Sequence, residues 1–296
     1  MMDLNAVLEG QKEEINRELD RVVPPEQTPP VDLHRAMRHS LFAGGKRLRP
    51  IMVLEACALA GAERSLALNA ALGIECLHTF TLIHDDLPCM DDDDFRRGVP
   101  TCHKVFGEDL AVLAGDALVF LGLDLLARPA EGVCPETTLE VVRVGTRTLG
   151  SRGVIGGQVI DLQAEGQIPS LEVLESIHIH KTAFLVMGSL EIGGLIGGAD
   201  KLHRERLREY GRHFGLAFQI TDDVLDVTGE SRVLGKTAGK DQQQQKMTYP
   251  ALMGVDRSRQ EARAHVEQAV ASLEGYGQKE SWFFRMLAHS LLDRVS

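Results

Sequence analysis

Aromatic residues are scarce in this sequence. They make up 5% of its 296 residues, with a single tryptophan, while alanine, leucine and glycine are abundant. Strands are enriched in aromatic and β-branched residues, and no segment alternates polar and apolar residues long enough to predict a strand. The composition therefore favours helices packed against helices over sheet architectures.

Positive charge is also in deficit. The chain carries 32 lysine and arginine residues against 43 aspartate and glutamate residues, a net charge of −11. Proteins that bind nucleic acid along their surface present a basic face. The charge balance therefore predicts no nucleic-acid partner, and any polyanionic ligand would need bridging cations or a local basic pocket.

Paired cysteines and a targeting segment are missing as well. The five cysteines, Cys57, Cys76, Cys89, Cys102 and Cys134, form no CxxC pair and are odd in number, so we expect buried, reduced thiols. The N-terminal stretch is acidic and amphipathic, unlike a signal peptide, and no segment approaches the ~18 uninterrupted apolar residues of a membrane span. These absences predict a cytoplasmic protein without a membrane span.

Helical periodicity runs through most of the chain. The stretches predicted to be helical are about 3–22, 32–43, 50–60, 65–86, 107–127, 136–149, 153–164, 171–197, 202–227, 256–273 and 281–293. Segment 228–247, which holds the Gln242–Gln245 tract, is predicted to be irregular. Because no linker separates two cores, residues 1–296 are predicted to form a single all-helical domain.

Two acidic clusters stand at the C-terminal ends of long apolar helices. Their members are Asp85, Asp86 and Asp91 to Asp94 in the run 84–94, and Asp222, Asp223 and Asp226 in the run 219–226. A helix C-terminus already carries partial negative charge, and two carboxylates about 4 Å apart repel by roughly 4 kcal/mol at an effective dielectric near 20. Such clusters are expected where divalent cations bind, and ligands that are all oxygen indicate a hard ion such as Mg²⁺.

Basic residues accompany the acidic clusters. The turn GGKRLRP at 44–50 places three cations at the start of a helix, which suits a diphosphate, although the spacing of a Walker A loop is absent. Arg96 and Arg97 follow the first acidic cluster, and Lys181 with Thr182 interrupts an apolar run. Further lysines lie in the irregular segment, namely Lys236, Lys240 and Lys246. Taken alone, the basic turn is a weak signal, because such turns are common on protein surfaces that bind no ligand.

Read together and in order, these segments resemble the trans-polyprenyl diphosphate synthase family, and within it the bacterial farnesyl diphosphate synthases. The matching stretches are GGKRLRP at 44–50, LIHDDLPCMDDDDFRRG at 82–98, GGQVIDL at 156–162, Lys181–Thr182, FQITDDVLDV at 218–227, LGKTAGKD at 234–241 and KMTYP at 246–250. Any one of them could arise by chance, whereas seven in the family's order and spacing make a specific signal.

The resemblance implies a fold and a set of metal ligands. The family fold is all-α, an isoprenoid-synthase-type helical bundle around a deep central cavity, and its members are usually homodimers. Two aspartate motifs face each other across the cavity mouth and bind about three Mg²⁺ ions when substrate is present. By position, the implied metal ligands are Asp85, Asp86, Asp91, Asp222, Asp223 and Asp226.

It also implies two sites for small-molecule diphosphates. The residues implied for the allylic diphosphate are Arg96, Lys181, Thr182, Gln219, Lys236 and Lys246. The residues implied for isopentenyl diphosphate are Gly45, Lys46, Arg49, His78 and Arg97. The catalytic residues would be Lys181, Thr182, Gln219 and Arg96, which hold the leaving group or steady the nascent cation.

The implied activity is Mg²⁺-dependent head-to-tail prenyl transfer by a farnesyl diphosphate synthase, or geranyltranstransferase. Such an enzyme joins isopentenyl diphosphate to dimethylallyl or geranyl diphosphate. Metal ions neutralise the leaving diphosphate so that the allylic C–O bond ionises. The double bond of isopentenyl diphosphate attacks the cation, the released pyrophosphate accepts the final proton, and an apolar cavity excludes water.

Product length in this family depends on bulky residues upstream of the first aspartate motif. Phe80 and Thr81 stand five and four residues before Asp85, and at about 1.5 Å per residue Phe80 lies roughly 7–8 Å down the helix. Together with the insertion Pro88–Cys89, this resembles the pattern of enzymes that stop at C15. Geranyl and geranylgeranyl diphosphate remain alternative products, since similar insertions occur in C20 synthases.

Three rival interpretations remain. A class I terpene cyclase would share an aspartate cluster but would not need the turn at 44–50. An HD-type metal phosphohydrolase, suggested by His84–Asp85, would need further histidine ligands. A regulatory subunit of a synthase typically lacks one aspartate motif, whereas both are present here. The segment 277–296 departs from the family's basic tail, although Arg294 could play the same part.

Overall fold

Helices make up nearly all of the regular structure. The computed structural model describes residues 3–164, 166, 168, 170–228 and 247–295. The helices are α1 (Leu4–Val22), α2 (Val31–Leu41), α3 (Leu48–Leu59), η1 (Arg64–Ala67), α4 (Leu68–Asp85), α5 (Cys102–Phe106), α6 (Glu108–Leu126), α7 (Pro135–Leu149), α8 (Val154–Ala164), α9 (Leu171–Ile177), η2 (His178–Ala183), α10 (Phe184–Ile196), α11 (Lys201–Thr228), α14 (Tyr249–Met253), α15 (Val255–Ser272), α16 (Trp282–His289) and η3 (Leu292–Arg294). The predicted all-α fold is confirmed.

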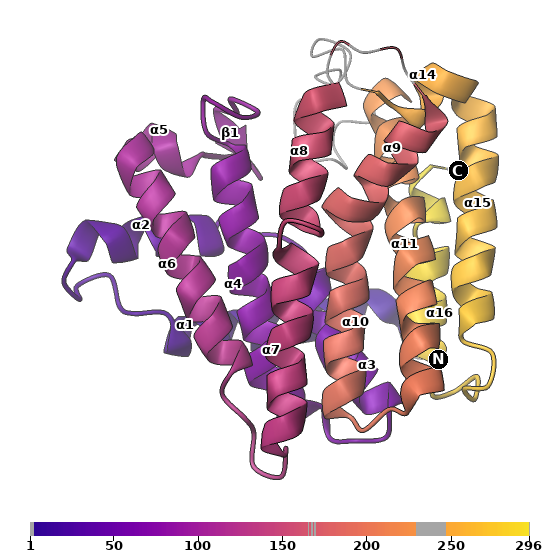
Figure 1. Cartoon of the computed structure of the whole chain (residues 1–296), viewed down its shortest axis with the longest axis horizontal. Coiled ribbons are helices and arrows are strands. Elements are labelled where there is room, and N and C mark those ends of the chain that lie inside the picture. The colour runs from indigo at the N-terminus through magenta and orange to yellow at the C-terminus, as the bar shows by residue number, and fades with distance from the viewer. Residues whose placement is uncertain (1–2, 165, 167, 169, 229–246, 296) are drawn as a thin grey trace.

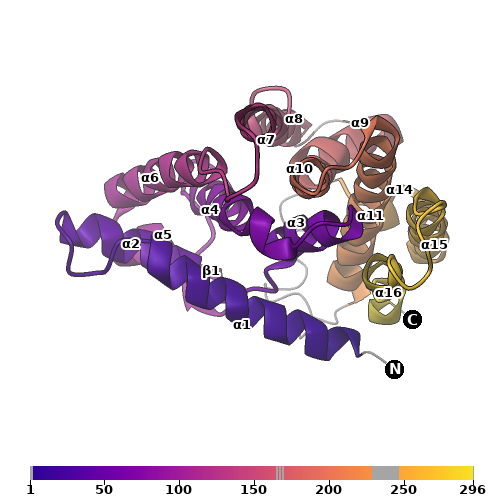
Figure 2. The same cartoon turned by 90° about the horizontal axis from the view of Figure 1, so that it is seen from below.

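The long helices pack side by side (Figure 1). α4 packs along α6, α10 packs against α3 and α11, and α11 packs against α15. Seen from below, α3, α4 and α10 occupy the middle of the molecule while α1 lies along one face (Figure 2). There α1 contacts α3, α4 and α16.

Helix α4 lies in the core. Its residues from Ala70 to Thr81 are all buried, as expected for a helix that is apolar on every side. Gly73 and Gly122 let α4 and α6 approach closely, because a Cβ at Gly73 would lie 2.8 Å from the Gly122 carbonyl oxygen. The C-terminal end of α4 thereby carries Asp85 and Asp86 from a packed interior toward the cavity described below.

The glycines at the end of α10 serve the same purpose within this chain. A Cβ at Gly193 would collide with the carbonyl oxygen of Val53 in α3, and a Cβ at Gly197 would lie 2.6 Å from the Cys57 carbonyl oxygen. α3 and α10 are therefore held together backbone to backbone. The main apolar cluster continues around them from Leu4 in α1 to Leu291 after α16.

Two helical stretches, Arg64–Asp85 and Leu171–Ile196, are long and apolar enough to cross a membrane by length and composition. Two such helices are weak evidence for a span, and neither is an uninterrupted apolar run, because Glu75 lies in the first and Lys181 in the second. In the structure, 72% and 50% of their most apolar windows are buried inside the protein. Core helices of globular proteins commonly have this character.

The structure departs from the predicted elements in several places, of which two lie beside the cavity described below. The stretch 171–197 is not one regular helix, because the π-helical turn η2 (His178–Ala183) separates α9 from α10. An antiparallel pair of two-residue strands, β1 (Phe95–Arg96) and β2 (Val99–Pro100), follows the first acidic cluster. Most of the predicted irregular segment, 229–246, lies outside the described residues.

The cysteines are all free thiols. Cys57, Cys76 and Cys102 are buried as predicted, whereas Cys89 and Cys134 are exposed. Burial raises the pKa of Cys57 and of Cys102 to about 11. These buried thiols therefore stay protonated near neutral pH.

Candidate functional site

A cavity of about 690 Å³ opens between α4, α6, α8, η2 and α11. Its charged and polar lining includes Arg49, His78, Asp85, Asp91, Arg96, Asp161, Lys181, Gln219 and Asp223. Its apolar lining includes Phe80, Val112, Val154, Ile155, Val159 and Leu185. One cavity thus offers charged groups and an apolar surface together.

The cavity gathers about two thirds of the predicted site residues whose positions the structure describes. Those lining it are Arg49, His78, Phe80, Thr81, Asp85, Asp91, Arg96, Lys181, Thr182, Gln219 and Asp223. Those described but not in its lining are Gly45, Lys46, Asp86, Arg97, Asp222 and Asp226. Lys236 and Lys246 lie outside the described residues.

The first aspartate motif is shaped by a loop that folds back over the end of α4. The backbone N–H of Asp91 donates to the Asp85 carbonyl at 2.9 Å, and that of Asp93 donates to the Asp86 carbonyl at 3.3 Å. Carbonyls in the last turn of a helix have no partner within the helix, so the loop satisfies two of them. As a result, Asp85 and Asp91 both line the cavity.

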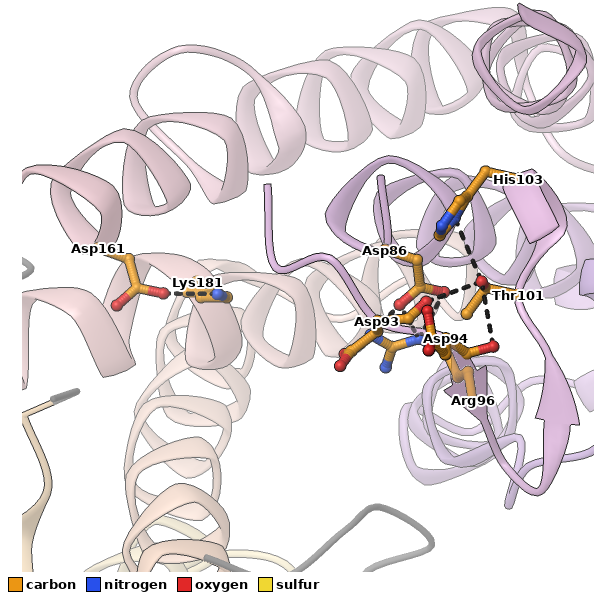
Figure 3. Close-up of polar contacts among 8 residues, drawn as sticks. All are labelled: Asp86, Asp93, Asp94, Arg96, Thr101, His103, Asp161 and Lys181. Carbon is orange, nitrogen blue, oxygen red and sulfur yellow. Dashed lines mark hydrogen bonds and ion pairs between the residues drawn. The ribbon is translucent and has the colours of Figure 1, made fainter. Parts of the chain in front are cut away.

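Asp86 faces the strand pair and not the cavity (Figure 3). Its carboxylate accepts from Arg96 Nε at 2.7 and 2.9 Å, and Arg96 Nη2 lies 2.5 Å from Asp86 Oδ1. The same Arg96 Nη2 is 3.6 Å from Asp93 Oδ2. Thr101, beside β2, donates its hydroxyl to the Asp93 carbonyl at 2.8 Å and so secures the loop.

Two aspartates of the second motif, Asp222 and Asp223, have different hydrogen-bond partners. Asp222 accepts from Arg294 Nη2 at 2.7 Å, which brings a residue from near the chain's C-terminal end against α11. Asp223 is 3% exposed and accepts from the backbone N–H of Tyr249 at 3.0 Å. Gln219 Nε2 also donates to Asp223, at 3.3 Å. Asp223 therefore joins the start of α14 to α11.

The carboxylates fit a hard divalent cation by their chemistry. Burial raises the pKa of Asp85; Lys181 opposes this and Asp91 adds to it. A cation beside such a buried, negatively surrounded carboxylate would relieve the repulsion. Among the described residues, no group of three or more His, Cys, Asp or Glu side chains is already arranged to hold a metal ion.

Lys181 and Thr182 lie in the π-helical turn η2, opposite α8. Lys181 Nζ donates to Asp161 at 2.6 Å (Figure 3). Burial acts to lower the pKa of Lys181, but the carboxylates Asp161, Asp85 and Asp91 outweigh it, so the pKa is raised. The ammonium group is therefore charged and held at the cavity wall.

Thr182 continues a short hydrogen-bond chain. Its hydroxyl donates to Gln219 Oε1 at 3.1 Å, and Gln219 in turn donates to Asp223. This chain links η2 to α11 across the cavity lining.

The basic turn 44–50 divides its cations between the cavity and the core. Arg49 Nη1 lies 3.2 Å from His78 Nε2, and burial followed by the nearby arginines lowers the pKa of His78 well below its usual value. His78 is therefore neutral and accepts from Arg49. Arg47 instead points inward, where it pairs with Glu75 at 2.5 Å. Of the three cations predicted to form a diphosphate cradle, Arg47 is therefore turned into the core, Arg49 lines the cavity, and Lys46 lies outside the cavity lining.

Gly45 and Arg97 form the other part of this basic region. Arg97 Nη1 donates to the Gly44 carbonyl at 2.5 Å. The guanidinium lies so close to Gly45 that a Cβ there would be 2.5 Å from Arg97 Cζ. Burial is the main cause that lowers the pKa of Lys46, and Arg294 lowers it further, so Arg294 lies near this basic region.

Several polar residues of the cavity lining, among them Asp161 and His178, were not assigned a role from the sequence. Asp161 pairs with Lys181, and His178 stacks on Tyr249 with ring centroids 5.5 Å apart. Burial and then Lys181 lower the pKa of His178 to about 3, so its imidazole is neutral. Each of them is a polar residue within an otherwise apolar helical stretch, and this pattern in the sequence could have identified them as candidates.

Comparison with known proteins agrees with this geometry. The family model described as polyprenyl synthetase matches residues 30–281. The chain is 48% identical over 259 residues to the chloroplastic geranylgeranyl pyrophosphate synthase of Catharanthus roseus, covering 87% of this chain and 72% of the relative. It is also 48% identical to the chloroplastic heterodimeric geranylgeranyl pyrophosphate synthase large subunit 1 of Arabidopsis thaliana, over 88% of this chain and 71% of the relative.

Solved structures show the same fold. The crystal structure of an FPP/GFPP synthase from Zymomonas mobilis superposes with a TM-score of 0.87 at 37% identity, covering 98% of each chain. The prediction of a cytoplasmic protein, in contrast, is wrong on this comparison, because the plant relatives are named as chloroplastic proteins. That prediction depended on missing features only, and these do not distinguish one compartment from another. The chain belongs to the polyprenyl synthetase family, and its chemistry is head-to-tail prenyl transfer.

Proposed function

We propose that this protein extends allylic diphosphates with isopentenyl diphosphate and releases geranylgeranyl diphosphate. The observation that carries the proposal is a single cavity in which Asp85, Asp91 and Lys181 meet an apolar wall. Charged groups can hold a diphosphate there, while the apolar wall accommodates a prenyl tail and keeps water from the carbocation.

The C20 product takes the place of the C15 product expected from the sequence. Plant relatives that are 48% identical are named geranylgeranyl pyrophosphate synthases, whereas the FPP/GFPP synthase is 37% identical. The C15 expectation depended on Phe80 as a floor. Phe80 lines the cavity together with the smaller Thr81, and we propose that a C20 tail passes beside the ring.

We propose the allylic diphosphate site at the mouth of this cavity. Lys181, held by Asp161, supplies a fixed positive charge, and Arg96 supplies a guanidinium that now binds Asp86. Thr182 and Gln219 present a hydroxyl and an amide from one hydrogen-bonded chain. Lys181, Thr182 and Gln219 are positioned before substrate arrives, so these three groups need little reorganisation when charge separates.

We propose that isopentenyl diphosphate binds at Lys46, Arg49 and Arg97. None of these three cations forms an ion pair with either aspartate motif among the described contacts. Arg49 and neutral His78 face the cavity, and Lys46, Gly45 and Arg97 lie beside them at the basic turn. Arg49 Nε is buried without a hydrogen-bond partner among the described residues. An incoming diphosphate oxygen would satisfy that donor.

Magnesium is the proposed cofactor, held by the two aspartate motifs. It would neutralise the leaving diphosphate and so assist ionisation of the allylic C–O bond. Asp85 and Asp91 already face the cavity, while Asp86 and Asp222 can contribute once Arg96 and Arg294 release them.

We further propose that residues 1–296 act as one domain and assemble as a homodimer. The cavity lining runs from Arg49 to Thr248, so the proposed site spans most of the chain and is not confined to one half of it. Apolar side chains on α6 support a self-association surface, since Leu113 is 53% exposed and Phe120 is 72% exposed.

The test is a product assay with purified protein, Mg²⁺ and labelled isopentenyl diphosphate. Dimethylallyl, geranyl and farnesyl diphosphate are supplied in turn, and dephosphorylated products are separated by chain length. A C20 product from all three starters, lost in EDTA, is expected. A C15 endpoint would retain the chemistry and refute the product, and no condensation with any starter would refute the function.

A further inference from the structure

Gln158 is a buried amide whose polar atoms are unused. Gln158 lies in α8, is 9% exposed and lines the cavity. Neither Oε1 nor Nε2 has a hydrogen-bond partner among the residues that the structure describes. Buried polar groups are nearly always bonded, so an amide left unbonded at a cavity wall indicates a ligand that supplies the partner.

The other amide in the cavity lining provides a contrast. Gln219 accepts from Thr182 through Oε1 and donates to Asp223 through Nε2, so both ends of its amide are engaged within the protein. Gln158 can therefore form hydrogen bonds with a bound molecule, whereas both ends of the Gln219 amide are already bonded within the protein.

Close packing fixes where Gln158 stands. At the neighbouring Gly157, a Cβ would lie 2.5 Å from the backbone nitrogen of Lys181, so α8 touches the π-helical turn η2 directly. Three residues further along α8, Asp161 binds Lys181 at 2.6 Å. Gln158 is thus held on the same wall as the Lys181 ammonium.

Its depth in the cavity follows from helix geometry. α4 and α8 end toward the same end of the bundle (Figure 1). At 1.5 Å per residue, Gln158 lies roughly 4–5 Å below Asp161 and about 6 Å above Val154 along α8. Asp161 belongs to the charged part of the cavity lining and Val154 to its apolar part. Gln158 stands between them, at the level where the carbons next to a bound diphosphate must lie.

We propose that Gln158 contacts the allylic carbons of the bound substrate and that its carbonyl oxygen stabilises the positive charge developing there. The inference depends on the proposed prenyl transfer. As the C–O bond breaks, its electron pair leaves with the diphosphate oxygen, and the amide neither forms a bond nor takes a proton. A neutral amide dipole suits this position, because it stabilises a cation without removing its proton.

The decisive variant is Gln158→Leu, which keeps most of the side-chain volume and removes both polar atoms. We expect kcat with geranyl diphosphate to fall on the order of a hundredfold, the size seen when one charge-stabilising group is lost. The melting temperature should stay the same or rise, because no unbonded amide remains buried. A purely structural Gln158 would instead show a lower melting temperature with kcat within twofold of wild type, which would overturn the proposal.

Gln11→Leu is the matched control. Gln11 is also a buried amide with an unbonded Oε1, but it lies in α1 and donates to Glu55 at 2.6 Å. This variant should lose stability and retain kcat, the opposite of Gln158→Leu. If Gln158→Leu does not fold, Gln158→Met gives the same comparison.

A second readout uses 2-fluorogeranyl diphosphate, whose fluorine disfavours the cation. The ratio of the single-turnover rates for the parent and fluorinated substrates should be larger in Gln158→Leu than in wild type, since the variant stabilises the charge less. An unchanged ratio would overturn the role in cation stabilisation. Wild-type condensation is measured first, so inactivity there would refute the function and not the role of Gln158.

Discussion

Gly45 has no side chain, and this leaves space for the guanidinium of Arg97. Its φ of +113° lies in the region that L side chains rarely adopt, and the Arg97 guanidinium occupies the space of a Cβ. The neighbouring Gly44 has a similar φ of +99° but nothing within 4 Å of an added Cβ. The two glycines thus share backbone strain and differ in steric contact.

This difference makes the pair a controlled experiment. Alanine at either position should destabilise the turn by a similar amount, about 1 kcal/mol, whereas Gly45→Ala should also displace Arg97. Losing one charged contact to isopentenyl diphosphate should raise its KM roughly tenfold. Steady-state kinetics would check this, with Gly44→Ala as the control. Equal KM values in the two variants would exclude Gly45 and Arg97 from that site.

Phe80 is the residue whose role depends most on product length. Its ring lies edge-on to His84, with centroids 5.8 Å apart, and lines the cavity below Asp85. Phe80→Ala removes most of that side chain, so we expect products longer than those of wild type. Chain-length analysis after dephosphorylation measures this, and Phe283→Ala, buried away from the cavity, controls for lost stability. An unaltered product profile would show that another residue limits the tail.

At the scale of elements, the positions of the helices followed largely from periodicity. The predicted stretches 136–149 and 153–164 correspond to α7 and α8 almost residue for residue. The strands β1 and β2 have two residues each, too few to show alternation. The turn η2 spans six residues, too few for periodicity to distinguish a π-helical turn from an α-helix.

The sequence predicted those parts of the candidate site where charged residues cluster along the chain. It did not predict the ion pairs between residues that are far apart in the sequence. Asp85 and Lys181 stand out in sequence as charges after apolar runs. That Asp161 would bind Lys181, and that Arg47 would turn inward to Glu75, depends on tertiary packing. Arg294 and Asp222, 72 residues apart in sequence, meet only in the folded chain.

Helices α11 and α15 meet through two histidines. His213 Nδ1 lies 2.9 Å from His265 Nδ1. Burial is the main cause that lowers the pKa of His265 to about 4, and His213 and Arg212 lower it further. The unfolded chain, with a histidine pKa near 6.5, therefore binds more protons than the folded one in mildly acidic solution.

It follows that this contact stabilises the fold above about pH 6.5 and that its contribution is lost as the pH falls toward about 4. His265→Gln should consequently flatten the decline of the melting temperature between these limits. Thermal unfolding across that pH range measures the slope, with His34→Gln, a histidine on α2, as control. Parallel curves for wild type and His265→Gln would contradict the assignment.

At the scale of the whole molecule, each aspartate motif is linked to an arginine from elsewhere in the chain. Arg96 holds Asp86 and Arg294 holds Asp222. A metal ion alone must displace an arginine, and a diphosphate alone must pull an arginine from its carboxylate. When both arrive, the ion takes the carboxylate and the diphosphate takes the arginine, so each charge finds a new partner.

Magnesium and inorganic diphosphate together should therefore stabilise the protein more than the two separate effects added. At concentrations about 100 times the dissociation constant, binding adds about 2.7 kcal/mol of stability, which corresponds to several degrees in melting temperature. Differential scanning fluorimetry would measure this, with sulfate in place of diphosphate as control. An equal shift in the presence of EDTA would show that the anion binds without the metal.

The turn η2 makes the length of its segment as important as its composition. A π-helical turn carries about one residue more than an α-helical turn. Deleting any one residue between 178 and 183 would restore regular α-helical geometry and keep α9 and α10 in phase, but it would shift the residues within the turn and so separate Lys181 from Asp161 or Thr182 from Gln219. The site therefore depends on the number of residues in this turn as well as on their side chains, and we expect insertions and deletions there to abolish activity.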